Sequence, residues 1–189
     1  MSEVLLYHHV QGLTDGVRSF ADELRQAGHT VHTPDLFDGQ TFKTLEEGMT
    51  YAREQGFDAL AERGVAAAER ISPAVCYAGF SFGVTVAQRL AQTRPGARGA
   101  LLMYSCLPVS EFGGAWPDGV PVQVHGKDGD EFFLEDIDAA RTLVDSNAQA
   151  ELFLYAGTEH LFADSSVSEY DPAAAKLLTE RVISFLNRT

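Results

Sequence analysis

The stretch "YAGFSFGVT", residues 77–85, places one serine between two phenylalanines, with a glycine beyond each phenylalanine. An apolar run precedes this stretch and a helical pattern follows it, so it predicts a sharp turn from a strand into a helix. Residues Gly79 to Gly83 fit the pattern G-x-S-x-G, in which such a turn presents a serine hydroxyl at the end of the strand. The glycines are needed because a Cβ there would collide with the crossing strand and helix. We therefore interpret Ser81 as a nucleophile and expect the Phe82 amide to face an oxyanion.

Short apolar runs alternate with helical patterns along the rest of the chain. Strands are expected at 4–9, 74–79, 99–105, 120–126 and 150–157, and another begins at residue 29 and stops at Pro34. Helices are expected at 16–28, 83–93, 132–146 and 171–188, with one or two more within 44–71. Apolar strands that alternate with helices predict a parallel sheet covered on both faces. We expect one α/β domain, residues 1–189, built on a six-stranded, mainly parallel, doubly wound sheet.

Composition limits the classes of protein that the chain can represent. With 189 residues and 45% hydrophobic content, the chain is expected to form a single core. A net charge of −13 argues against nucleic acid and anionic membranes as partners. The N-terminus lacks a basic leader, no apolar run approaches the roughly 20 residues that span a bilayer, and the two cysteines form no close-spaced pair. These features predict a cytoplasmic protein.

A nucleophilic serine needs a histidine as its base. In enzymes built around this turn, the histidine follows the serine in the chain, and only His125 and His160 follow Ser81. His160 lies in "GTEHLFAD", a loop between the last strand and the last helix that can reach back over Ser81. His125 ends an apolar strand and is expected to face the packing between sheet and helix. We therefore expect His160 to be the base.

The base in turn needs a carboxylate that orients its ring. The segment "HGKDGDE" after the fifth strand offers Asp128, Asp130 and Glu131. Asp128 is the first carboxylate past the end of the strand and is the expected acid, with Asp130 as the next choice.

Several of these motifs together resemble the dienelactone hydrolase family of α/β-hydrolases. They are "GFSFG", "HGKDGD" and "YAGTEHLFAD", with "TPDLFDGQTF" and the final "YDPAAAKLLTERVISFL", and the resemblance covers nearly the whole chain. It implies a minimal α/β-hydrolase fold that lacks the two leading antiparallel strands of larger members. It also implies a triad of Ser81, Asp128 and His160, and an oxyanion hole formed by the amides of Phe82 and Val10. The implied substrate is a small ester, lactone or thioester, with no cofactor.

Two positions depart from the prototype members of that family. These enzymes carry a cysteine nucleophile supported by a glutamate after the first strand, where this chain has Ser81 and His9. They also hold the substrate carboxylate with an arginine a few residues after the catalytic histidine, where this chain has Asp164. We expect His9, Phe80 and Asp164 to line the substrate pocket, and the charge of Asp164 to favour neutral substrates over carboxylated ones.

Two alternatives stay open at this point. A non-catalytic, ligand-binding α/β-hydrolase relative is one, and it would be expected to have a broken triad. A nucleotide-binding protein is the other, but "VQGLTDG" after the first strand lacks both G-x-G-x-x-G and the P-loop lysine. No metal site is expected, because neighbouring His8 and His9 point to opposite faces of a strand.

Overall fold

Six parallel strands form one sheet in the order β2-β1-β3-β4-β5-β6 in the computed structural model, which describes residues 1–189. The strands are β1 (Glu3–Tyr7), β2 (Thr30–His32), β3 (Cys76–Phe80), β4 (Gly99–Met103), β5 (Val122–Lys127) and β6 (Ala150–Tyr155). The helices are α1 (Asp15–Gln26), α2 (Leu45–Gln55), α3 (Phe57–Ala68), α4 (Phe82–Thr93), α5 (Glu131–Ser146) and α6 (Pro172–Leu186). This architecture confirms the predicted single-domain, doubly wound α/β fold.

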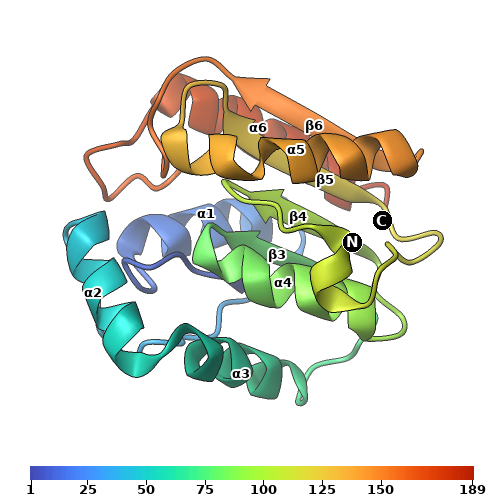
Figure 1. The fold of residues 1–189 in the computed structure, drawn as a ribbon, viewed down its shortest axis with the longest axis horizontal. Helices are drawn as coiled ribbons and strands as arrows, with labels where there is room; N and C mark the ends of the chain where they lie inside the picture. Colours follow the sequence, from blue (N-terminus) through green and yellow to red (C-terminus); the bar gives the residue numbers. More distant parts are fainter.

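Two helical layers bury the two faces of the sheet. The apolar residues of α1 and α6 belong to one core cluster, and those of α3, α4 and α5 belong to the other. Figure 1 shows α4 in the middle of the second layer, between α3 and α5, with α1 and α6 on the opposite side of the sheet. The longest helix, α5, has 16 residues, and no helix is long and apolar enough to cross a bilayer.

Two segments show in detail how the predicted elements begin and end. The helical region 44–71 consists of α2 and α3, and Gly56, with a φ of 85°, separates them. Thr44 and Glu47 form a capping box at the start of α2. The second strand was expected to stop at Pro34, and β2 ends at His32, two residues before it; Pro34, which has no amide hydrogen, cannot donate to a strand ladder.

The order of the strands determines where a site can form. From β1 the chain first moves outward to β2, then returns to the other side of β1 with β3 and continues outward to β6. In open parallel sheets, ligands bind at the carboxyl ends of the strands beside such a reversal. Here the reversal lies between β1 and β3, so the loops that follow these two strands lie next to one another.

Candidate active site

The turn at Ser81 has the strained geometry of a nucleophile elbow. Ser81 connects β3 to α4 with a φ of 50° and a ψ of −114°, a backbone conformation that non-glycine residues rarely adopt. A Cβ at Gly79 would collide with the backbone of Gly83 and Val84, and a Cβ at Gly83 would collide with the Tyr7 carbonyl. Both glycines therefore allow β1, β3 and α4 to approach closely enough to form this turn.

His160 lies beside the Ser81 hydroxyl. The loop after β6 carries it, and its Nε2 is 2.8 Å from Ser81 Oγ. The backbone amides of His160 and Leu161 both donate hydrogen bonds to Oε2 of Glu169, at 2.7 and 3.1 Å. The loop is thereby held in the position that brings the imidazole over the elbow.

Asp130, rather than Asp128, contacts the other side of the imidazole. Its Oδ2 is 2.6 Å from His160 Nδ1, while its Oδ1 accepts a hydrogen bond from the Phe132 amide at the start of α5. Asp128 is exposed, and its Oδ1 accepts from the Gly157 amide. The expectation that Asp128 would orient His160 is wrong, because Asp128 lies in the turn before the chain bends into α5.

The sequence did contain a signal for Asp130. It stands immediately before the apolar periodicity of α5, where aspartate is a favoured N-cap. A capping residue is fixed by the helix that it begins, so its second oxygen has a defined direction. Distance along the chain from the end of β5 was therefore the wrong criterion for choosing between the two aspartates.

These contacts define the hydrogen-bonding state of the imidazole. Asp130 is buried, and its carboxylate can only accept, so Nδ1–H of His160 is the donor of this hydrogen bond. The lone pair on Nε2 is then directed to the Ser81 hydroxyl, which donates to it. This arrangement can take a proton from Ser81, and the Asp130 carboxylate would stabilise the imidazolium that results.

Two backbone amides border the same site. Phe82 is the first residue of α4, where an amide has no intrahelical partner and carries part of the positive end of the helix dipole. Val10 belongs to the loop after β1. Phe82 and Val10 both line the pocket that contains Ser81.

The pocket around Ser81 has a volume of about 380 Å³ and mainly apolar walls. Its polar groups include Ser81, His160 and two aspartates, and it contains no lysine or arginine. The lining residues are Val10, Leu45, Met49, Phe57, Asp58, Ala61, Ser81, Phe82, Thr85, Tyr104, Ser105, Leu107, Phe132, Asp136 and His160.

None of the three expected pocket residues His9, Phe80 and Asp164 lines this cavity. All three are buried, and the Phe80 ring packs against those of Phe20 and Tyr104 at centroid distances of 5.1 and 5.3 Å. Nε2 of His9 lies 2.7 Å from Oδ2 of Asp164. The expectation that Asp164 lies at the mouth of the site is therefore wrong, because its side chain turns inward to His9.

Asp164 is surrounded by hydrogen-bond donors. His9 and Thr14 donate to its Oδ2, and the Ser166 amide and hydroxyl donate to its Oδ1. Burial raises the pKa of Asp164, but these hydrogen bonds, that of His9 first among them, outweigh burial and lower the pKa to about 2. A Cβ at Gly16 would collide with this carboxylate, so the start of α1 packs directly on it.

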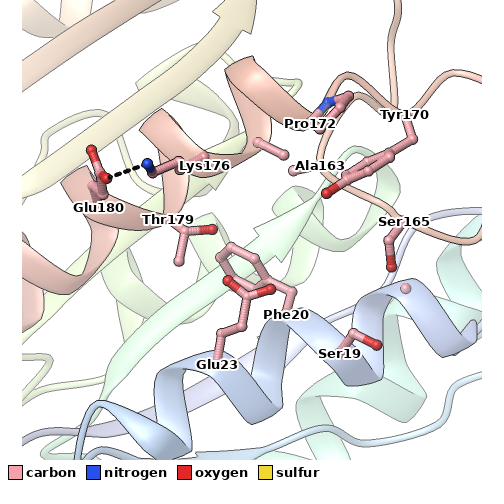
Figure 2. A pocket seen from close by; sticks show the side chains of 12 residues that line it. Ser19, Phe20, Glu23, Ala163, Ser165, Tyr170, Pro172, Lys176, Thr179 and Glu180 are labelled. Carbon is pink, nitrogen blue, oxygen red and sulfur yellow. Dashed lines mark ion pairs between the residues drawn. The ribbon is translucent and has the colours of Figure 1, made fainter.

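A second pocket lies next to this buried pair. Figure 2 shows it between α1, with Ser19 and Glu23, and α6, with Lys176 and Thr179. Its volume is about 240 Å³, and neither Ser81 nor His160 lines it. It offers no nucleophile paired with a base, so the chemistry of the elbow belongs to the larger pocket at Ser81.

The other histidine considered as a base, His125, is unsuited to that role. It is fully buried in β5, with Nδ1 2.9 Å from the Tyr155 hydroxyl and Nε2 3.2 Å from Gln123 Oε1. Burial, with a smaller contribution from the charge of Arg181, lowers its pKa to about 3. His125 therefore stays neutral and does not contact Ser81.

An ion cluster around the buried Lys127 side chain supports the loop that carries His160, and sequence reasoning missed this cluster. Nζ of Lys127, at the end of β5, lies 2.6 Å from Glu159 Oε2 and 2.7 Å from Asp171 Oδ2. Glu159 immediately precedes His160, and Asp171 caps α6. Burial lowers the pKa of Lys127, but the two carboxylates outweigh it and raise the pKa. The sequence did contain a signal for this ion cluster: a lysine ends an apolar strand, and two acidic residues occur near the last helix.

No group of three or more histidine, cysteine, aspartate or glutamate side chains is arranged to hold a metal ion. The doubly wound sheet with a serine elbow at its reversal point and a histidine on the last loop defines an α/β-hydrolase. The chain belongs to the dienelactone hydrolase family, whose model matches residues 2–189. It is accordingly a hydrolase that acts on ester bonds.

Solved structures share this fold at low sequence identity. A provisionally assigned dienelactone hydrolase from Klebsiella pneumoniae subsp. pneumoniae has a TM-score of 0.77 and 18% identity, covering 100% of this chain and 88% of its own. The dienelactone hydrolase of Anabaena variabilis has a TM-score of 0.70 and 19% identity, with coverages of 100% and 86%. A dienelactone hydrolase-like promiscuous phosphotriesterase from metagenomic libraries has a TM-score of 0.73, 18% identity and coverages of 100% and 86%. No curated protein sequence matches the chain significantly.

Proposed function

We propose that the chain hydrolyses a small carboxylic ester, lactone or thioester through an acyl-enzyme on Ser81. The observation that carries this proposal is the continuous set of contacts from Ser81 Oγ to His160, at 2.8 Å, and from His160 to Asp130, at 2.6 Å. A non-catalytic relative would be expected to lack one of these groups. The site residues of the proposal are Ser81, His160 and Asp130, with the amides of Phe82 and Val10.

The first half-reaction forms the acyl-enzyme. Ser81 Oγ attacks the carbonyl carbon while its proton passes to Nε2 of His160, and the oxyanion is held by the amides of Phe82 and Val10. The carbonyl re-forms as the bond to the leaving alcohol or thiol breaks, and His160 returns the proton to that leaving group. Asp130 holds the imidazole in the required orientation throughout.

The second half-reaction releases the acid. Water attacks the acyl carbon and gives a proton to His160, the bond to Ser81 breaks, and Ser81 recovers that proton. An ester or thioester gives one carboxylic acid and one alcohol or thiol, whereas a lactone, whose alcohol stays attached to the acyl group, gives a single hydroxy acid; one water is consumed in each case. The apolar lining of the pocket fits a small organic acyl or leaving group.

Covalent labelling with a fluorophosphonate, alongside turnover of p-nitrophenyl acetate, tests the proposal. Ser81→Ala is expected to lose the label and to lower kcat by about 10³-fold or more with little change in fold. Ser105→Ala is the matched control, because Ser105 is a second hydroxyl in the same pocket and donates to Asp136. The control should retain the label. Equal labelling of Ser81→Ala and the wild type would exclude Ser81 as the nucleophile.

A further inference from the structure

Two carboxylates lie in the wall of the Ser81 pocket. Asp58 belongs to the first turn of α3, and Asp136 belongs to α5. The two helices that carry these aspartates, α3 and α5, flank α4, which begins next to Ser81 (Figure 1). Apart from His160, the cavity is lined by no basic side chain, since it contains neither lysine nor arginine.

Neither carboxylate is neutralised by a neighbour. Asp58 and Asp136 take part in no ion pair of the structure. The Ser105 hydroxyl and the Cys106 amide both donate to Oδ2 of Asp136, at 2.6 and 3.1 Å, which leaves its Oδ1 without a donor from the protein. The partial positive charge at the start of α3, about half a unit, is smaller than the full negative charge on Asp58.

An aromatic ring accompanies each carboxylate in the pocket wall. Phe57 adjoins Asp58, and its ring centroid is 5.7 Å from that of Phe82. Phe132 lies one helical turn before Asp136 on α5, and its ring centroid is 5.0 Å from that of His160. Aromatic faces attract cations and also accept the methyl or methylene groups of an organic ammonium ion. The pocket thus combines the two kinds of group that recognise such ions.

We infer that this pocket selects esters or thioesters whose acyl or leaving group carries an ammonium group, ahead of neutral ones, and disfavours anionic ones. The inference rests on the proposed function and specifies its substrate class. A positive charge about 6 Å from one carboxylate gains about 1.4 kcal/mol at an effective dielectric near 40, which is tenfold in kcat/KM. The net charge of −13 adds a long-range attraction for cations at low salt.

Three thioesters of similar size separate charge from shape. Acetylthiocholine is the cation, 3,3-dimethylbutyl thioacetate replaces its nitrogen with carbon, and 4-(acetylthio)butanoate is the anion. We expect kcat/KM to fall in that order, with the cation about tenfold above its neutral isostere at low ionic strength. The ratio should approach one at high salt, where a nearby charge is screened.

Substitution of each carboxylate tests the origin of the preference. Asp58→Asn and Asp136→Asn should each lower the cation-to-neutral ratio severalfold, and Asp58→Asn does so without touching the hydrogen bonds of Ser105. Asp145→Asn removes the same charge from α5 about 13 Å further along the helix axis, outside the pocket, and should leave the ratio unchanged.

Two outcomes would overturn the inference while leaving the proposed function in place. One is a wild-type ratio of one or less at low salt, and the other is a ratio that neither pocket substitution changes. Failure to hydrolyse p-nitrophenyl acetate as well as all three thioesters would contradict the proposed function itself, and the inference would fall with it.

Discussion

His9 and Asp164 are 155 residues apart in the chain and meet in a buried hydrogen bond of 2.7 Å. The Gln11 amide donates to Nδ1 of His9, so the His9 proton lies on Nε2 and is donated to the carboxylate. The pair ties the loop after β1, which carries Val10, to the loop after β6, which carries His160. The two loops that border Ser81 are therefore fixed to each other.

Asp164→Asn should destabilise the fold in a pH-dependent way. The folded pKa of Asp164 is about 2, against an ordinary value of 3.8, so ionisation stabilises the protein above about pH 4. This contribution, about 2 kcal/mol, is lost as the pH falls through the folded pKa. Urea denaturation from pH 3 to pH 7 measures the free energy of unfolding of both proteins. The gap in this free energy between wild type and variant should be constant above pH 5 and should narrow toward pH 3. Asp138→Asn, at a side chain 94% exposed, should show no such gap. A gap that widens toward acid pH would contradict this account of Asp164.

Asp130→Asn should reduce activity far more than Asp128→Asn. Of the two aspartates, only Asp130 contacts His160. An asparagine at position 130 would misorient the imidazole or favour the wrong tautomer. We expect kcat to fall by about 10²- to 10⁴-fold for Asp130→Asn and by only a few-fold for Asp128→Asn. Steady-state kinetics on p-nitrophenyl acetate measure both. The opposite ranking would assign the acid to Asp128.

Gly83→Ala should disrupt the elbow, although its φ lies outside the left-handed region. The new Cβ would collide with the Tyr7 carbonyl, and neither β1 nor α4 can move away without disturbing the core. We expect a loss of about 3 kcal/mol in the free energy of unfolding. Gly39→Ala is the control: its φ is 84° but its surroundings are open, so it should cost only about 1 kcal/mol. Equal losses would mean that the close approach at Gly83 is not required.

His125 should make the stability depend on pH in mildly acid solution. Its folded pKa of about 3 is below the ordinary value of 6.5, so the unfolded chain binds a proton that the folded protein excludes. Above pH 6.5 His125 is neutral in both states and does not affect the pH dependence. As the pH drops from 6.5 toward 3, the free energy of unfolding falls by about 1.4 kcal/mol per pH unit. His125→Gln should flatten the measured slope between pH 6 and pH 4 by this amount. His32→Gln, at a side chain that is 38% exposed, should retain the wild-type slope.

The sequence by itself determined the architecture, because this information is local. Alternating apolar strands and amphipathic helices require a parallel sheet with two helical layers, and the glycines around Ser81 specify a tight strand-to-helix turn. The position of His160 after the last strand followed from the same alternation. The family motifs then indicated an ester hydrolase, as the family match over residues 2–189 shows.

Only the tertiary structure decided which polar side chains meet. Asp128 and Asp130 are two residues apart, and the bend into α5 exposes the first while directing the second at His160. Asp164 was expected beside the substrate, yet it is buried against His9. The free-energy cost of burying its carboxylate is offset by hydrogen bonds, including those from distant His9 and Thr14. Such pairings depend on side-chain directions at loops that converge in space, and neither periodicity nor spacing along the chain encodes those directions.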